Sequence, residues 1–397
     1  MKYIVVLGDG MSDYPVEALN GKTPLEVARK PYMDMISQKG ELGLAKTVPD
    51  DLPPGSDVAN LSVMGYDPHK YYTGRSPLEA VSMGVELSPY DTAFRVNTVT
   101  LSDDADYLQK TMLDYSAGEI STKESGIIIS DIQKALGSEF LSFYAGVSYR
   151  HLLVWKGCEG EWSCTPPHDI SGKKIASYLP DNPVILGLMQ KSAEILKDHP
   201  VNKKRIENGQ NPANSIWIWG QGKKPVLPSF SEKYGVTGCV ISAVDLVKGL
   251  GICAGIRSVA VAGTTGNIHT DFGAKARAAL DALKTDDFVY IHIEAPDECG
   301  HHFEIENKVR AIELIDEKVI KPVFDTLTAQ GVDFSILVMP DHATPLSLGT
   351  HVADPVPYAL YRSGNNNNNA AYTEANAAKY KLNKSGHTVM DYFIRGE

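Results

Sequence analysis

Three apolar runs of this 397-residue chain, at 3–7, 288–293 and 334–339, are each followed by residues that can bind metal ions. These residues are Asp9 after the first run, Asp297 and His301 after the second, and Asp341 with His342 after the third. Short runs of β-branched and apolar residues bounded by Gly, Pro and Asp are typical of buried parallel strands. The carboxyl ends of such strands open at one edge of a sheet, so we predict that these segments meet in one crevice.

Spacing divides the candidate ligands into two sets. Asp297 and His301 are four residues apart, so on a helix they share one face and can bind one ion, with His351 of a later loop as third ligand. Asp9, Asp341 and His342 remain for a second ion. That set leaves one further oxygen ligand to be found, and Ser56 is the obvious candidate.

Ser56 follows Pro53-Pro54-Gly55 at the position where the N-cap of a helix would lie. Its bland interpretation is a cap alone. Its functional interpretation is a nucleophile, because a metal-bound serine hydroxyl loses its proton far more easily than a free one. Two ions about 4 Å apart can clamp the entering and leaving oxygens on phosphorus. The pattern therefore predicts metal-dependent phosphoryl transfer.

The ligand types also indicate the metal. Mixed carboxylates and imidazoles suit manganese or zinc better than magnesium or calcium, which prefer oxygen ligands alone. We expect two divalent ions, with Mn²⁺ first and Zn²⁺ or Mg²⁺ as alternatives. Each single Asp has the alternative role of a turn or cap residue. Seven candidate ligands at one predicted sheet edge, however, favour the metal site.

Composition restricts the partners. The formal net charge of −11 argues against nucleic acid, which demands a clustered positive field. The chain has no apolar segment long enough for a membrane span and no signal peptide, and its five scattered cysteines fit reduced thiols. We expect a cytoplasmic protein without a nucleic-acid or membrane partner, and find no pattern that indicates an oligomeric state.

The order of predicted elements indicates the architecture. Strand patterns at 215–219, 259–262, 288–293 and 334–339 alternate with helical ones, the clearest at 309–327. This predicts an α/β three-layer sandwich with a mostly parallel sheet. An earlier helix is expected at 23–39. Between 91 and 214 the predicted strands and helices are short and broken by loops. We therefore predict a discontinuous catalytic domain (1–90 and 215–397) and an inserted α+β domain (91–214).

Longer motifs carry a family resemblance. They are Gly8-Asp9-Gly10-Met11, Pro54 to Asn60, Tyr72-Thr73-Gly74-Arg75, Ile216 to Gly222, Glu294 to Glu298, Gly300-His301 and Pro340-Asp341-His342. With these the chain resembles the archaeal type of cofactor-independent phosphoglycerate mutases, of the alkaline phosphatase superfamily. The resemblance implies an alkaline-phosphatase-like fold. It also implies one metal held by Asp9, Ser56, Asp341 and His342, and another held by Asp297, His301 and His351.

The resemblance further implies a reaction. Ser56 would take the phosphoryl group from 3-phosphoglycerate or 2-phosphoglycerate and return it to the neighbouring hydroxyl, while basic groups bind this small phosphorylated metabolite. The expected substrate contacts are Asn60, Arg150, His168, Asp169, Arg205, Lys233 and Lys275. The planar fork of arginine suits a carboxylate or phosphate, which favours the arginines. For each cation alone, a solvated surface charge is an equal alternative.

A second reaction stays open. The segments Ser148 to His151 and Thr165 to Ile170 resemble a bacterial branch associated with homoserine kinase activity. Such an enzyme would use the same metal and serine chemistry to make phosphohomoserine. Glu119 could then receive the ammonium group of the acceptor. His168 and Asp169 would be acid-base or substrate groups in either reaction.

Overall fold

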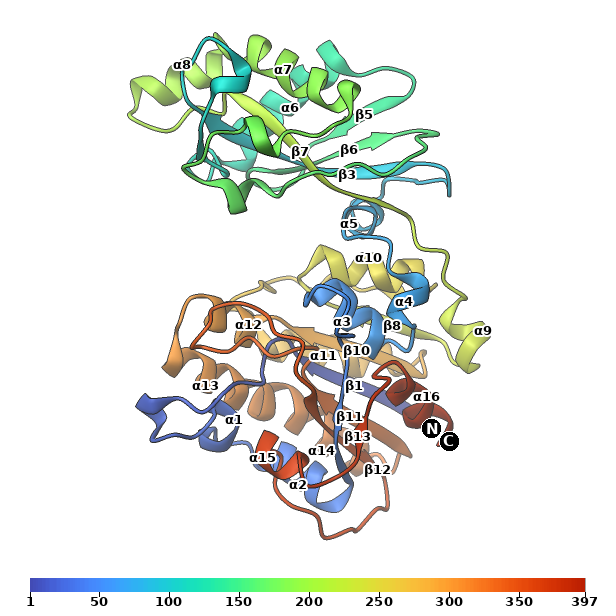
Figure 1. Cartoon of the computed structure of the whole chain (residues 1–397). Coiled ribbons are helices and arrows are strands. Elements are labelled where there is room, and N and C mark those ends of the chain that lie inside the picture. Colours follow the sequence, from blue (N-terminus) through green and yellow to red (C-terminus); the bar gives the residue numbers. More distant parts are fainter. Residues whose placement is uncertain (397) are drawn as a thin grey trace. The chain divides into compact units, whose positions relative to one another are not determined.

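The computed structural model describes residues 1–396, which form two compact units (Figure 1). The first comprises Met1–Tyr72 and Val226–Glu397, and the second is Thr73–Pro225. The second unit contains the whole of the predicted insertion, 91–214, but extends beyond it at both ends. The strand predicted at 215–219, within the first domain, forms β7 (Ser215–Lys223), which pairs with β3 (Thr92–Leu101) inside the second unit.

The first unit is built on an eight-stranded sheet with the order β13-β2-β12-β11-β1-β10-β8-β9. The strands are β1 (Lys2–Gly8), β2 (Glu41–Ala45), β8 (Gly238–Ile241), β9 (Arg257–Ser258), β10 (Phe288–Ile293), β11 (Phe334–Met339), β12 (Val356–Arg362) and β13 (Leu382–Asn383). Only β12 runs antiparallel to its neighbours. The predicted three-layer α/β sandwich with a mostly parallel sheet is thereby confirmed.

The central strands follow the predicted apolar runs closely. All residues of β10 and β11 are buried, as expected for strands covered by helices on both faces. The strand predicted at 259–262 is wrong: only the two residues of β9, just before it, pair with β8. Edge strands of this length carry too little periodicity to be read from sequence.

Helices cover both faces of this sheet (Figure 1). They are α1 (Pro24–Val27), α2 (Pro31–Lys39), α3 (Ser56–Val63), α4 (Pro68–Tyr71), α9 (Phe230–Tyr234), α10 (Asp245–Cys253), α11 (Phe272–Ala282), α12 (Ala295–His301), α13 (Ile305–Ile315), α14 (Lys321–Ala329), α15 (Glu374–Ala377) and α16 (Thr388–Arg395). The single helix predicted at 23–39 is two helices, because Pro31 disfavours helical backbone at the residue before it. A π-helical turn, Asp316–Ile320, joins α13 to α14, so the predicted helix at 309–327 is continuous.

The second unit is a five-stranded antiparallel sheet with helices. Its other elements are α5 (Ser76–Ser82), β4 (Met112–Asp114), α6 (Thr122–Leu136), β5 (Leu141–Tyr144), β6 (Arg150–Trp155), α7 (Pro183–Leu196) and α8 (Pro200–Glu207). It has its own apolar core, which includes Phe94, Ile128 and Trp217. Across residues 1–396 of the two units, no helix combines the length and apolarity that a membrane span requires.

Candidate metal centre

The sheet topology places the candidate ligands at one edge. β1 lies between β10 and β11 and is parallel to both, so its carboxyl end opens beside theirs. Asp9 follows β1, Asp297 lies on α12 after β10, and Asp341 and His342 follow β11. Three segments distant in sequence thus meet, as the apolar runs predicted.

Asp297, His301 and His351 form one group that could hold a metal ion, with ligand atoms within 4.8 Å of one another. His301 Nε2 lies 3.2 Å from Asp297 Oδ2, and His351 Nε2 lies 3.3 Å from Asp297 Oδ1. The four-residue spacing on α12 produces the first contact. The two imidazole Nε2 atoms are 2.9 Å apart, so all three side chains converge on one point.

A second group shares Asp297 with the first. Its members are Asp9, Asp297 and His342, all buried, again with ligand atoms within 4.8 Å. His342 Nε2 also lies 3.4 Å from Asp341 Oδ2 and 3.1 Å from the Ser56 hydroxyl. The sequence spacing assigned Asp297 to one ion only. In the structure its carboxylate lies between the two groups, where it can serve both.

The carboxylates of this cluster are better suited to binding cations than to pairing with one another. Asp9 Oδ1 is buried and has no hydrogen-bond partner among residues 1–396. Burial, together with the charges of Asp341 and Asp297, raises the pKa of Asp9 well above its usual range. A nearby cation would reverse that shift. Mixed carboxylate and imidazole donors also match the ligand preferences of Mn²⁺ and Zn²⁺.

Ser56 is the first residue of α3, and Gly55 is the N-cap. Ser56 is therefore not the N-cap residue, and in the first turn it is Asp57 Oδ1 that accepts from the Val58 backbone N–H. The Ser56 hydroxyl instead faces His342, and the residue is only half-buried. A hydroxyl that is not used for capping, at the mouth of a ligand cluster, has the placement that a nucleophile needs.

A layer of polar groups outside the ligand set positions the ligand carboxylates. Fully buried His292 of β10 places Nε2 2.9 Å from Asp9 Oδ2, and its Nδ1 lies 3.2 Å from the Ser242 hydroxyl. Thr344 donates to Asp297 Oδ1 at 2.5 Å. The buried Lys308 ammonium, paired with Asp13 at 2.6 Å, donates to the Thr344 carbonyl and fixes that segment.

Asn60, predicted as a substrate contact, lies in this layer. It is fully buried, donates to Asp341 Oδ2 at 2.8 Å and accepts from the Tyr290 hydroxyl at 2.8 Å. Tyr290 and His292 alternate along β10 and so share one face of the strand. Neither residue was predicted as part of the site. Two large polar side chains, two positions apart in a run of buried apolar residues, could have indicated a polar contact on that face of the strand.

Three predicted substrate cations have other partners. Arg205 is 2% exposed, pairs with Glu124 at 2.8 Å and donates to the carbonyls of Asn211 and Ala117. Lys275 is buried and donates to the His292 carbonyl. Lys233 donates to the Gly65 carbonyl beside Asp391. Each of these three cationic groups therefore already has a partner within the protein.

The remaining predicted substrate residues lie in the second unit. Arg150 is exposed and stacks over the Tyr149 ring, with 5.4 Å from Cζ to the ring centroid. His168 and Asp169 are exposed neighbours, with 3.6 Å between His168 Nε2 and Asp169 Oδ1. The His168 ring lies against Tyr115 and Trp219, and this partial desolvation lowers its pKa below the usual value, which favours the neutral imidazole.

A cationic cluster that the sequence analysis did not identify surrounds Glu79 in the same unit. Arg75 Nε and Arg95 Nε lie 2.8 Å and 3.3 Å from its carboxylate, and Arg95 also lies over the Trp219 ring. Although burial opposes it, the charges of Arg95, Arg75 and Arg150 hold the pKa of Glu79 below its usual range. Three cations around one carboxylate leave an excess of positive charge. Arg75 belongs to the motif Tyr72-Thr73-Gly74-Arg75, whereas no sequence pattern indicated a role for Arg95.

Comparisons with known proteins identify the family to which the chain is similar. Residues 37–202 match the family model of 2,3-bisphosphoglycerate-independent phosphoglycerate mutase. A protein of that name from Methanosarcina barkeri is 50% identical over 388 residues, 96% of each chain. A probable one from Geobacter sulfurreducens is 52% identical over 373 residues, 93% of this chain and 92% of the relative.

Solved structures show the same fold. The PH0037 protein of Pyrococcus horikoshii superimposes with a TM-score of 0.83 at 31% identity, covering 99% of this chain and 96% of its own. A cofactor-independent phosphoglycerate mutase of Thermoplasma acidophilum gives a TM-score of 0.68 at 26% identity, with 100% and 99% covered. The chain belongs to the archaeal-type family of cofactor-independent phosphoglycerate mutases and is an enzyme of the isomerase class.

Proposed function

We propose that this enzyme interconverts 3-phosphoglycerate and 2-phosphoglycerate without 2,3-bisphosphoglycerate, through a phosphoserine formed on Ser56. One observation carries the proposal. The Ser56 hydroxyl lies 3.1 Å from His342 Nε2, at a cluster in which Asp297 belongs to two groups of potential metal ligands. A nucleophile beside two adjacent cation sites is the arrangement that phosphoryl transfer needs.

The ligands divide between two divalent cations in this proposal. Asp297, His301 and His351 would hold one ion, and Asp9, Asp341, His342 and Ser56 would hold the other. When bound, the cations lower the pKa of the serine hydroxyl and neutralise charge on the phosphoryl oxygens. Mn²⁺ remains the proposed metal on ligand type.

The residues then carry two successive transfers. Ser56 Oγ loses its proton and forms a bond to phosphorus, while the bond from phosphorus to the substrate oxygen breaks and that oxygen takes up a proton. In the second transfer the neighbouring hydroxyl of the glycerate loses its proton and bonds to phosphorus, while the bond from phosphorus to Ser56 Oγ breaks and Oγ takes up a proton. His168, with a lowered pKa, and Asp169 are proposed for these proton movements.

The second unit is proposed to supply the anion-binding groups. Arg150 is exposed, and it adds to the positive charge that Arg75 and Arg95 place around Glu79. A guanidinium binds a carboxylate or phosphate through two parallel hydrogen bonds. These arginines replace Arg205, Lys233 and Lys275 as the cations for phosphoglycerate.

A direct assay tests this function. The purified enzyme, Mn²⁺ and 3-phosphoglycerate should yield 2-phosphoglycerate without added 2,3-bisphosphoglycerate, and no turnover would refute the proposal. A parallel reaction with homoserine and a panel of phosphoryl donors tests the alternative expected from the sequence. Phosphohomoserine formation without mutase turnover would replace the proposed reaction with that kinase activity.

A further inference from the structure

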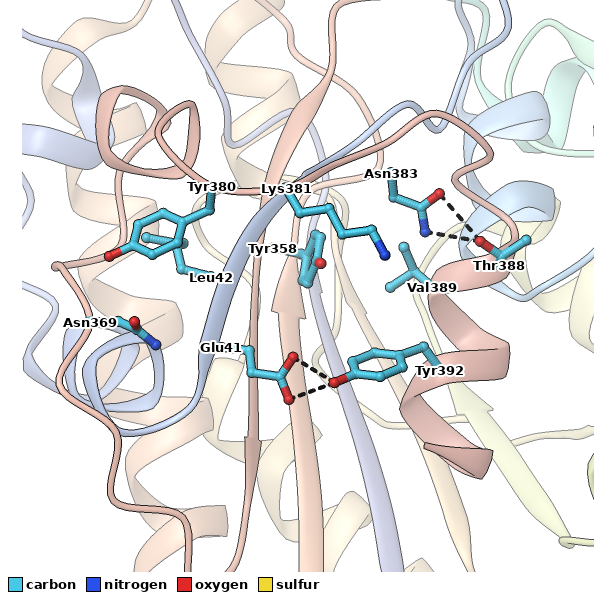
Figure 2. A pocket seen from close by; sticks show the side chains of 10 residues that line it. All are labelled: Glu41, Leu42, Tyr358, Asn369, Tyr380, Lys381, Asn383, Thr388, Val389 and Tyr392. Carbon is cyan, nitrogen blue, oxygen red and sulfur yellow. Dashed lines mark hydrogen bonds between the residues drawn. The ribbon is translucent and has the colours of Figure 1, made fainter. Parts of the chain in front are cut away.

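A cavity of about 450 Å³ lies in the first unit, apart from the candidate metal centre (Figure 2). β2, β12, α16 and the segment 369–383 supply its walls, and none of the proposed metal ligands lines it. Cavities of this size bind small molecules in other proteins. The chemistry of its ligand depends on which polar groups in its wall are already satisfied.

Most of those groups are paired with one another. The Glu41 carboxylate accepts from the Tyr392 hydroxyl at 2.7 Å and from Arg362 Nη1 at 3.2 Å. Asn383 and Thr388 are hydrogen-bonded to each other at 2.9 Å. Figure 2 shows both pairs at the side of the cavity formed by α16. The only carboxylate in the wall is thus neutralised within the protein and is not free for a ligand.

Two groups in the wall that can donate have no hydrogen-bond partner among residues 1–396. One is the hydroxyl of Tyr358, a residue that is 8% exposed. Its ring lies over Gly43, the opposite residue of β2, where a side chain would collide with the ring. The other is the ammonium of Lys381, an exposed residue, which has no hydrogen bond or ion pair within those residues; Figure 2 shows this side chain extending across the cavity near Tyr358.

The rest of the wall is suited to an organic group. Leu42, Val389 and the Tyr358 ring give the cavity an apolar side. A free ammonium and a free phenol hydroxyl together match an oxyanion, since both donate and one carries positive charge. We propose that this cavity is a binding site for a small organic acid, with its carboxylate or phosphonate at Lys381 and Tyr358 and its apolar part against Leu42 and Val389.

Calorimetric titration of the full-length enzyme tests the site with three probes: benzoate, phenylphosphonate and neutral benzamide. We expect both acids to bind the wild type and benzamide to bind more weakly. Lys381→Ala should weaken acid binding about 10-fold or more, and Tyr358→Phe about 5-fold, as expected for a charge-assisted and a neutral hydrogen bond. Lys384→Ala, which removes an exposed lysine outside the cavity wall, should leave binding unchanged.

The titrations can also overturn the proposal. Failure of both acids to bind excludes the site, and equal affinity for benzamide and benzoate excludes an anion as its ligand. Equal acid affinity in the wild type and Lys381→Ala would place the binding elsewhere, including the metal centre. Lys381 is exposed, so its alanine variant should fold normally and remains informative even if Tyr358→Phe is unstable.

Discussion

His292 Nε2 lies 2.9 Å from Asp9 Oδ2, and both side chains are almost completely buried. Burial lowers the pKa of His292 to about 3, so the imidazole is neutral. When Asp9 is ionised, as it is beside a bound cation, Nε2 carries the proton that Asp9 accepts, and Nδ1 accepts from Ser242. This hydrogen bond fixes one oxygen of Asp9 and leaves Oδ1, which lacks a hydrogen-bond partner within residues 1–396, for a cation.

The first prediction concerns this positioning contact. His292→Leu should weaken Mn²⁺ binding about 10- to 100-fold, the range typical when an outer partner of a metal ligand is lost. Calorimetric titration of Mn²⁺ measures the affinity directly. His151→Leu, which removes another buried histidine but from the second unit, is the matched control. Equal losses of affinity in the two variants would show a general effect on the fold and contradict the positioning role.

Asp297 is the ligand that the two groups share. Asp297→Asn should therefore reduce the bound metal from two ions to one or none and abolish mutase activity, whereas loss of a ligand to one ion alone would spare the other. Elemental analysis after gel filtration gives the stoichiometry. Glu298→Gln changes a half-exposed carboxylate on the same helix and should retain both ions. Two ions bound with unchanged affinity in Asp297→Asn would contradict the shared-ligand assignment.

Metal binding should depend on pH through His301. Its hydrogen bond to Asp297 raises the pKa of this imidazole to about 9, so below that pH a cation must displace a proton. Because protons compete with the metal, affinity for Mn²⁺ should rise as pH increases from about 6 to 9. Titrations in buffers of different ionisation enthalpy would measure the proton release. An affinity independent of pH would show that His301 is not a ligand.

Arg150 is predicted to bind the anionic substrate. Arg150→Gln should raise the KM for 3-phosphoglycerate about 10-fold or more, because a charge-assisted hydrogen bond contributes about 1.5–3 kcal/mol. Initial rates over a range of substrate concentrations separate KM from kcat. Lys134→Gln alters an exposed lysine of the same unit and serves as control. Equal KM values for Arg150→Gln and wild type would remove Arg150 from the substrate site.

The sequence predicted most accurately the features that depend on local pattern. Buried strands show as apolar runs, so β10 and β11 were found, and the spacing of Asp297 and His301 holds on α12. The sheet to which β7 belongs depends on non-local pairing with β3, which no local pattern encodes. Arg205 and Lys275 resemble surface cations in sequence. Their burial follows from carbonyls and carboxylates contributed by distant segments.

The proposed mechanism depends on a covalent phosphoserine intermediate at Ser56. Wild-type enzyme incubated with Mn²⁺ and 3-phosphoglycerate, quenched in acid and digested, should yield a peptide phosphorylated at Ser56 by mass spectrometry. Ser56→Ala should bind substrate but show neither phosphopeptide nor turnover. Phosphate on Ser56 in the wild type alone, with turnover lost in the variant, is the predicted result. Turnover retained by Ser56→Ala would contradict the mechanism.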